Sequence, residues 1–448
     1  MIFWSKRYAV IAASMAFSAI CTAAQNSVDQ SIDKNIGSWV ETYKHLHQNP
    51  ELSMQEKETS AFVAAGLKSL GYEVSDHLGQ YSNPSDISYG LVGVLKNGPG
   101  PVVYVRTELD GLPVTENTGV PYASKVKVKR ANGEVGVMHA CGHDLHMTVF
   151  LGTAKILAEN KSQWSGTVVM LGQPAEEVVS GAVAMLSAGL FTKFPKPDYV
   201  IALHDSADMP AGTVAWHVGP MLAGADSVDI TIRGYGGHGA MPQITKDPIV
   251  IGAELVMALQ TVVSRETNPL TPAVVTVGSF HAGTKHNIIP DEAHLQLTVR
   301  TMTPAQREKT LAAITRITNG IAAAAGIPAE RAPIIEIAKD HVPATINDAA
   351  LTQRTAAAME KALGKENVLA GQPIMASEDF SLFALEDPKP PISMFWLGAV
   401  DPLKWKDAQE HGTRLPGPHS SECAPLPEPA IRAGVKAMSA VVMDLLKK

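Results

Sequence analysis

The hydrophobic pattern of residues 30–220 alternates between two periods. Apolar positions at helical spacing alternate with short apolar runs rich in β-branched residues, which are typical of strands. The pattern predicts helices at Gly37–His47, Glu56–Leu70, Leu145–Ala158 and Gly181–Leu190, and strands at Val102–Arg106, Gly166–Leu171 and Tyr199–Leu203. Buried strands that alternate with helices indicate a mainly parallel central sheet covered by helices, so we expect an α/β fold.

Residues 223–335 follow a different order. Their pattern predicts strand Ser227–Arg233, helix Pro248–Ser264, strands Ala273–Phe280 and Ala293–Arg300, helix Pro304–Ala325 and strand Pro333–Ile337. This βαββαβ order fits a ferredoxin-like unit. Afterwards the α/β pattern resumes with helix Asp348–Leu363, strand Ile392–Leu397 and a helix from Glu428. We therefore expect residues 223–335 to be inserted into a domain formed by residues 25–222 and 336–448.

Residues 1–24 carry the pattern of an export signal. Two basic residues precede an apolar run, Tyr8–Ile20, and Thr22 and Ala24 are spaced as at a cleavage site. The run is short for a membrane span, and Ile20 stands where a lipoprotein signal needs a small residue before Cys21. We expect a cleaved signal peptide, a periplasmic or secreted protein, and no stable membrane insertion after cleavage. An uncleaved anchor is the alternative.

Composition narrows the possible partners. The chain has 448 residues, enough for two domains, and its 45% hydrophobic and 18% charged residues are ordinary for a folded protein. A net charge of −7 argues against nucleic acid as a partner. The dense basic segment Lys125–Arg130 is short, which favours a solvated turn or strand edge.

The segment HACGHDLH, His139–His146, carries the strongest chemical signal. It combines histidine, cysteine and aspartate, and the adjacent Glu176 and Glu177 follow a predicted strand. Thiolate, imidazole and carboxylate are ligands of divalent metals such as zinc, and a second acid beside a ligand can shuttle protons. Glu108, Asp110 and His204 also follow predicted strands. Ligands bind beyond the carboxyl ends of such strands, so we expect one cluster there.

Each of these signals has a plain structural alternative. Cys141 and His143 flank Gly142, whose turn can aim both at one point, but they could also be a buried cysteine and a capping histidine. After cleavage Cys141 and Cys423 could form a disulfide. We favour Cys141 as a ligand because histidines lie near both cysteines. Asp144 could cap a helix or hold a ligand histidine through its second nitrogen.

Further candidates lie outside this segment. His204 could be a ligand or a structural histidine, whereas His419 lies in a proline-rich loop, which favours a functional role. His238, between glycines in YGGHGAMP, could face a substrate or simply lie at the surface. Asn287 and Arg300 could bind a carboxylate or an oxyanion, although a structural role is the simpler reading of each.

Taken in order, several motifs resemble one family. LHQNPELSMQEKET, RTELDGLPVTENTG, HACGHDLH, GQPAEE, GGHGAMP, HNIIP and SEDFS occur in the order seen in a group of metal-dependent amidohydrolases. The group includes hippurate hydrolases, N-acyl-L-amino-acid amidohydrolases and auxin-conjugate hydrolases, and it is related to aminoacylase and carboxypeptidase G. The resemblance extends from about residue 35 to the end of the chain.

The resemblance implies two divalent ions (zinc, manganese or cobalt) in a catalytic α/β domain, and an inserted domain that acts as lid and dimer interface. It makes Cys141 the bridging ligand and Glu176 the general base that acts on a metal-bridged water; the other ligands would be His143, Glu177, His204 and His419. His238 would reach the active site of the partner in a homodimer and steady the oxyanion. Asn287 would contact substrate, and we add Arg300 there, with Asp110 and Asp144 as supports behind the ligands.

Three departures from the family pattern concern the pocket more than the chemistry. Leu145 replaces a usual glycine, Val178 and Val179 replace a glycine-rich stretch, and Cys423 occupies an often aromatic position. We expect hydrolysis of the amide bond of N-acyl amino acids, hippurate-like or N-acetylated, which are small substrates with a free carboxylate. The alternatives are a carboxypeptidase or dipeptidase, or a non-catalytic periplasmic protein that binds metal or peptide.

Overall fold

The computed structural model describes residues 5–130 and 133–447, with side chains from Ser27 onward. Two compact units form. The first comprises the chain up to residue 218, residues 347–371 and the chain from residue 383; the second comprises residues 219–346 and 372–382. The predicted insertion was 223–335, and no pattern in the sequence indicated the segment 372–382.

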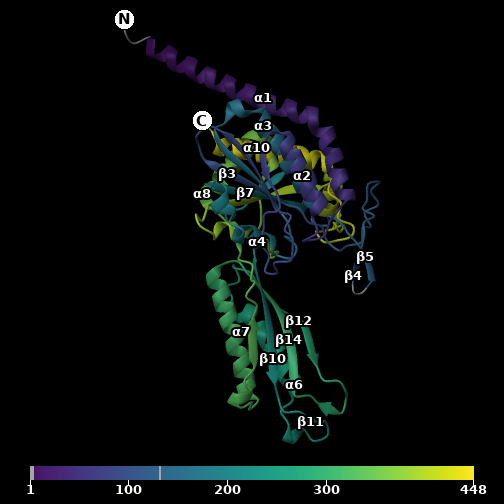
Figure 1. Ribbon diagram of the computed structural model, residues 1–448. Coiled ribbons are helices and arrows are strands. Elements are labelled where there is room, and N and C mark those ends of the chain that lie inside the picture. The colour runs from purple at the N-terminus through teal and green to yellow at the C-terminus, as the bar shows by residue number, and fades with distance from the viewer. Residues whose placement is uncertain (1–4, 131–132, 448) are drawn as a thin grey trace. The chain divides into compact units, whose positions relative to one another are not determined.

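A mainly parallel sheet forms the centre of the first unit (Figure 1). Its strands, in spatial order, are β1 (Glu73–Ser75), β2 (Leu91–Asn97), β6 (Gly166–Gln173), β3 (Val102–Glu108), β7 (Tyr199–Pro210), β18 (Ile392–Val400), β8 (Val214–Trp216) and β17 (Val368–Ala370). The run β6–β3–β7–β18 is parallel, whereas β1 and β2 are antiparallel additions at one edge. The predicted α/β fold class is confirmed.

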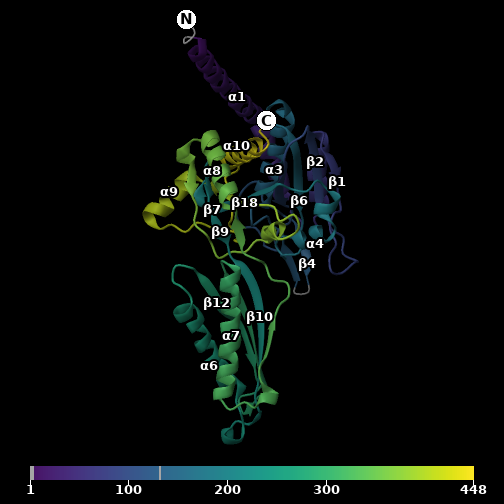
Figure 2. The same cartoon turned by 90° about the vertical axis from the view of Figure 1, so that its left-hand side faces the viewer.

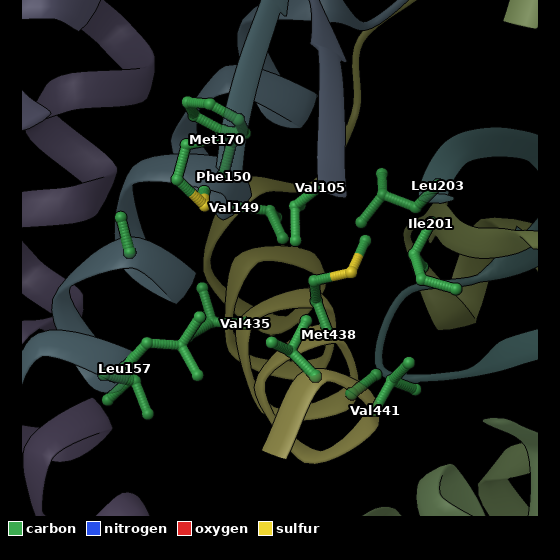
Figure 3. Close-up of a cluster of buried hydrophobic side chains, with 14 of the residues drawn as sticks. Val105, Val149, Phe150, Leu157, Met170, Ile201, Leu203, Val435, Met438 and Val441 are labelled. Atoms are coloured by element: carbon green, nitrogen blue, oxygen red, sulfur yellow. The ribbon is translucent and has the colours of Figure 1, made fainter. Parts of the chain in front are cut away.

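Helices cover both faces of this sheet. They are α1 (Ser5–Gln48), α2 (Lys57–Ser69), α3 (His143–Glu159), α4 (Gly181–Ser187), α5 (Leu190–Lys193), α8 (Ala349–Leu363), α9 (Pro402–His411) and α10 (Pro427–Leu445). Val105 of β3 joins a core with Val149 of α3 and Met438 of α10, as Figure 3 shows. Tyr104, one residue earlier, meets Phe191 of α5 edge-on. Successive strand residues point to opposite faces, so both faces are buried.

Helix α1 is longer than the predicted helix Gly37–His47. One side of its described part packs on the rest of the first unit: Ile32 and Trp39 are buried, and Asp29 lies 2.5 Å from the ammonium group of Lys436 on α10. Residues 1–4 of the predicted signal peptide lie outside the described residues, as do the side chains up to residue 26. Cleavage and export therefore stay predictions.

The second unit is built around a four-stranded antiparallel sheet (Figure 2). Its strands, in spatial order, are β12 (Ala273–Ala282), β14 (Glu292–Thr301), β10 (Gly224–Arg233) and β15 (Ile334–Ile337); its helices are α6 (Pro248–Thr261) and α7 (Pro304–Ala324). The carboxylate of Asp247 caps α6 and the hydroxyl of Thr303 caps α7. The chain order βαββαβ and this strand order confirm the ferredoxin-like prediction.

Helix α6 continues as a π-helical turn, Val262–Glu266. Among the described residues, Pro248–Glu266 is the one helical stretch whose length and composition would suffice to cross a membrane, and one such stretch is weak evidence. Its Ile251, Leu255 and Leu259 are buried in the core of the second unit. Burial of that side fits a core helix.

Several local predictions need correction. His204 does not follow its strand but lies inside β7, opposite Trp396 of β18. The helix predicted at Gly181–Leu190 is two helices, α4 and α5, separated by Gly189 in a left-handed conformation. Strand β2 and helix α9 were not predicted. The basic segment Lys125–Arg130 ends in β4 (Lys127–Arg130), which pairs with β5 (Gly133–Gly136) in a hairpin.

Candidate metal centre

Gly142 shapes the loop that leads into α3. Its φ is +74°, and a β-carbon there would lie 2.5 Å from a carboxylate oxygen of Asp205. Only glycine fits a left-handed position with so close a neighbour. Cys141 and His143 flank this residue, and both are buried. The turn therefore places two metal-ligating side chains at the amino end of α3.

The ring of His143 is oriented by the main chain. Its Nδ1 lies 2.8 Å from the backbone oxygen of Asp110, and because a carbonyl only accepts, Nδ1 carries the proton. Nε2 is therefore the ring atom that can bind a cation once its own proton is displaced. This atom is buried without a hydrogen-bond partner among the described residues, and it lies 3.9 Å from carboxylate oxygens of both Glu176 and Glu177.

His204 repeats the same arrangement from β7. Its Nδ1 donates to the backbone oxygen of Asp205 at 2.8 Å, and its Nε2 lies 3.5 Å from the sulfur of Cys141. Two histidines from different elements thus turn their Nε2 atoms towards one region, each with its tautomer set by a backbone carbonyl.

The two adjacent acids lie on a tight turn after β6. Ala175 and Val179 have φ of +51° and +54°, and the amide of Val179 donates to the carbonyl of Glu176 at 2.7 Å. A left-handed conformation at a β-branched residue costs about 1–3 kcal/mol, and such strain gathers at functional sites. Val178, between Glu177 and Val179, is exposed.

His419 approaches from the loop before α10. Its backbone amide donates to the carbonyl of Ala140 at 2.8 Å, and its Nε2 lies 3.3 Å from a carboxylate oxygen of Glu177. Its side chain is 57% exposed. The backbone bond to Ala140 therefore ties this loop directly to the ligand loop, and His419 forms the open side of the cluster.

Two sets of three donors share Cys141. The ligand atoms of Cys141, His143 and His204 lie within 4.8 Å of one another, and so do those of Cys141, Glu177 and His419. A residue common to two triads is placed to bridge two cations. The donor types, thiolate, imidazole and carboxylate, suit a borderline-soft divalent metal.

The electrostatics of the cluster favour added positive charge. Burial, followed by the charges of Glu177 and Glu176, raises the pKa of the Cys141 thiol well above its usual range. Burial alone would lower the pKa of His143, but its bond to Asp110 and the charges of Glu108 and Glu177 raise it to about 10. A divalent cation would displace the proton from that ring and let the thiol ionise. The residues present therefore fit a metal.

A buried network supports His204 from behind. His146 lies 2.9 Å from a carboxylate oxygen of Glu108, and its Nε2 accepts the backbone amide of Asp205 at 2.8 Å. The Asp205 carboxylate lies 3.2 Å from Nδ1 of His204. Burial opposes ionisation of Asp205, but the neighbouring rings of His146 and His204 hold the pKa of its carboxyl below the usual range.

The two predicted supporting aspartates behave differently. Asp110 accepts from the hydroxyl of Ser53 at 2.7 Å and from the backbone amide of Glu177 at 3.0 Å, besides orienting His143. Asp144 is not the N-cap residue of α3, which is Gly142, although it accepts the first-turn amide of Leu145 at 2.9 Å, and it does not hold a proposed ligand histidine. Its carboxylate lies 2.6 Å from Nδ1 of His47, whose Nε2 lies 3.0 Å from Glu116. Sequence reasoning missed this buried group because its members come from three separate segments.

The remaining cysteine does not pair with the ligand loop. Cys141 and Cys423 are both buried thiols, and neither forms a disulfide. Cys423 packs against Met138 and Ala140. The arrangement leaves Cys141 available as a ligand.

In the second unit, His238 and Asn287 come together on a short ribbon. His238 belongs to β11 (Gly237–His238), which pairs with β13 (Ile288–Ile289), and the amide of Gly239 donates to the carbonyl of Asn287 at 2.9 Å. Nδ1 of His238 accepts the amide of Ala240 at 3.0 Å, so Nε2 of the neutral ring carries the proton. Both side chains belong to exposed residues.

Arg300 is not part of this ribbon. It lies near the far end of β14, opposite Ala225 of β10, and its guanidinium donates to the hydroxyl of Thr298 at 2.6 Å. The structure therefore brings His238 and Asn287 together but leaves Arg300 apart from them.

The chain is similar to known hydrolases along most of its length. The sequence profile of Peptidase family M20/M25/M40 matches residues 104–443. Thermostable carboxypeptidase 2 of Saccharolobus solfataricus is 35% identical over 85% of this chain and 91% of its own. Hippurate hydrolase of Campylobacter jejuni is 38% identical over 78% and 85%, and N-acetyl-L-cysteine deacetylase of Bacillus subtilis is 37% identical over 76% of each chain.

Solved structures agree with the sequence comparisons. A putative aminohydrolase from methicillin resistant Staphylococcus aureus superposes with a TM-score of 0.80 at 31% identity, over 94% of this chain and 100% of that one. The YXEP protein of Bacillus subtilis, described as a dinuclear metal binding peptidase from the M20 family, gives 0.72 at 27% identity, over 92% and 99%.

Proposed function

The chain belongs to Peptidase family M20/M25/M40, and from that premise we propose that it hydrolyses the amide bond of N-acyl amino acids, hippurate-like or N-acetylated. It is a metal-dependent hydrolase of that family, as its ordered motifs indicated. The names of two relatives, a hippurate hydrolase and an N-acetyl-L-cysteine deacetylase, support this substrate class. The observation that carries the proposal is the pair of donor triads that share Cys141, with Glu176 beside them.

Two divalent cations, zinc, manganese or cobalt, would be held by the triads described above, with Cys141 between them. When bound, the ions supply Lewis acidity towards the scissile carbonyl and towards water. The dinuclear description of the YXEP protein and the lone pairs turned inward by His143 and His204 support this assignment. His146 and Asp205 keep the ring of His204 in place.

Glu176 is the proposed general base. Its side chain is 9% exposed, and a carboxylate oxygen lies 3.9 Å from Nε2 of His143, at the edge of the donor cluster. From there it can accept a proton from the attacking water and deliver it to the leaving amine. Glu177, next in the chain, turns towards His419 and acts as a ligand.

The second unit contributes the remaining groups of the proposal. His238 presents Nε2–H as a donor for the developing oxyanion, and Asn287 on the same ribbon contacts substrate. We propose a homodimer in which His238 serves the active site of the partner subunit. Support comes from the exposed apolar residues of α6, Val250 and Met257, and from β12, which is an edge strand. The bond of Arg300 to Thr298 favours a structural role for that residue.

Changing Glu176 to Gln tests the mechanism. The amide cannot accept the proton, so we expect kcat on N-acetyl and N-benzoyl amino acids to fall by about 10²–10⁴-fold. Metal content should stay at the parent's value, because the proposed ligands are intact. Turnover equal to that of the parent would refute the assignment.

The same assay separates the competing substrate classes. The likeness to thermostable carboxypeptidase 2 favours true peptides as the second candidate. A panel of acetyl, benzoyl and dipeptide substrates, compared by kcat/KM, distinguishes amidohydrolase from peptidase activity. Membership of a hydrolase family and the presence of the Glu176 carboxylate argue against the third alternative, a non-catalytic protein that binds metal or peptide.

Export is also part of the proposal. The basic and apolar pattern before residue 25 supports it. Amino-terminal sequencing of protein recovered outside the cytoplasm would decide between cleavage after Ala24 and a retained anchor.

A further inference from the structure

Buried carboxyl groups hold the main chain on both sides of Glu176. The backbone amide of Ala175, the residue before it, donates to Oε1 of Glu56 at 2.7 Å. The backbone amide of Glu177, the residue after it, donates to Oδ2 of Asp110 at 3.0 Å. The turn that carries the proposed base is therefore fixed from elsewhere in the chain at the residue before Glu176 and at the residue after it.

Glu56 makes the less expected of these contacts. Its side chain is fully buried, and the same Oε1 also accepts the amide of Met54 at 2.9 Å. Met54 and Ala175 are both non-glycine residues with positive φ, +67° and +51°. Such conformations persist where neighbouring contacts fix them. One carboxyl oxygen thus joins two strained loops that are far apart in the sequence.

A second contact reinforces this junction. The hydroxyl of Ser53 donates to Oδ2 of Asp110, the oxygen that also receives the amide of Glu177. The loop of residues 53–56 therefore meets the Glu176 turn at two carboxyl groups. Among the described residues, Glu56 forms no hydrogen bond to a proposed metal ligand. Its influence on Glu176 therefore passes through Ala175.

We propose that Glu56 is a positioning residue for Glu176: its carboxyl group binds the Ala175 amide and so fixes the direction of the catalytic carboxylate. The inference rests on the function proposed above and extends it to a residue outside the metal centre. Without Glu56, the buried amide of Ala175 and the partly buried amide of Met54 lose their acceptor, and the left-handed conformation at Ala175 loses one of its restraints.

The contact needs an acceptor oxygen and does not need a negative charge. Burial, followed by the charge of Asp110, raises the pKa of Glu56 to about 8, so the group is mostly neutral at pH 7. Its Oε2 is buried without a hydrogen-bond partner among the described residues. The carboxamide of glutamine has the same shape and one acceptor oxygen, so Glu56→Gln should preserve the contact, whereas Glu56→Ala removes it.

Glu51 provides a matched control. Its carboxylate also accepts two backbone amides, those of Glu58 and Thr59, at 3.2 and 2.7 Å. Both amides belong to the first turn of α2, and neither belongs to the Glu176 turn. Glu51→Ala therefore removes a comparable pair of hydrogen bonds from a neighbouring place without releasing Ala175.

The experiment compares Glu56→Ala, Glu56→Gln and Glu51→Ala in the metal-loaded full-length enzyme. We measure kcat, KM, metal content, melting temperature and hydrogen exchange in peptides that cover residues 172–181. For Glu56→Ala we expect kcat to fall about 10–100-fold with little change in KM or metal content, because a small misplacement of a catalytic group is costly. Exchange at the Ala175 amide should become faster.

The other variants should separate positioning from stability. Glu56→Gln should restore kcat to within about threefold of the parent, and Glu51→Ala should lower the melting temperature while leaving kcat and exchange at Ala175 near the parent values. Should Glu56→Ala fail to fold, Glu56→Asp takes its place with the same expectations, because it keeps the buried carboxyl but shortens it by one methylene.

Two results would overturn the proposal. The first is an exchange rate at the Ala175 amide that is the same in Glu56→Ala as in the parent. The second is a loss of kcat in Glu51→Ala as well as in Glu56→Ala, in proportion to the fall in melting temperature of each variant. If the parent itself hydrolyses none of the substrates, the proposed function fails, and the exchange measurement alone still decides whether Glu56 holds the turn.

Discussion

The proposed site residues of the two units are held in opposite ways. In the first unit His143 is fully buried, and its ring is oriented by the backbone oxygen of Asp110. In the second unit His238 is exposed, and its recorded hydrogen bond stays within its own ribbon, to Ala240. The donor cluster is therefore assembled by the fold of one unit alone, whereas the ribbon offers a donor whose target must come from outside it.

The sharpest test of this contrast is His238→Ala. If the exposed ribbon supplies an oxyanion donor, kcat should fall by about 10²–10³-fold. Metal content should be unchanged, because the donor cluster is complete in the first unit. His286, an exposed histidine next to Asn287, is the control, and His286→Ala should retain nearly full activity. Equal and small effects of the two changes would show that the ribbon has no catalytic part.

A second test concerns the exposed apolar side of α6. Val250 and Met257 are 62% and 72% exposed and lie seven residues apart, on one side of the helix. If they form a dimer contact, Val250→Glu with Met257→Glu should halve the mass measured by light scattering. Leu403 on α9 of the first unit is 79% exposed, and Leu403→Glu should leave the mass unchanged. A parent that is already monomeric would contradict the homodimer.

The smallest effect on activity is expected at His47, behind the donor cluster, where stability is tested instead. Burial lowers its pKa, but hydrogen bonds to Asp144 and Glu116 outweigh this and raise it to about 10. Because the folded form holds the proton more tightly, the stabilisation is complete below about pH 6.5 and is lost as pH rises towards 10.

Urea unfolding of the parent and of His47→Gln, in the same metal-containing buffer at several pH values, measures the stabilisation that His47 contributes. The advantage of the parent should shrink by up to about 1.4 kcal/mol per pH unit between pH 6.5 and 10. Exposed His294 on the second unit's sheet is the comparison, and His294→Gln should change the free energy of unfolding little. If the difference in unfolding free energy between the parent and His47→Gln does not change with pH, His47 is not a charged, buried histidine.

Periodicity and strand ends predicted much of the fold and the composition of the donor cluster. Local patterns determine elements, and the carboxyl ends of parallel strands share one edge, so Glu176 and Asp110 could be expected near each other. His204 was placed after its strand because the apolar run ends at Leu203, yet pairing with β18 continues β7 to Pro210.

The contacts of Glu56 and His47 could not be predicted in this way. Glu56 meets Ala175 across 119 residues, and His47 meets Asp144 across 97. Neither contact is visible in the hydrophobic pattern of the sequence, because a buried polar residue in a helix or loop cannot be told from a surface residue until its partner is known. The roles of such residues depend on tertiary structure alone.

Helix α1 also affects when the first unit can fold, because it packs against a helix that is synthesised much later. Its Asp29 and Asp33 pair with Lys436 and Arg432 of α10, and Arg432 follows Asp33 by 399 residues. The core between these two helices therefore cannot form before α10 has been synthesised. If the proposed export threads the chain through a membrane from its amino end, the first unit would stay unfolded until α10 has also passed.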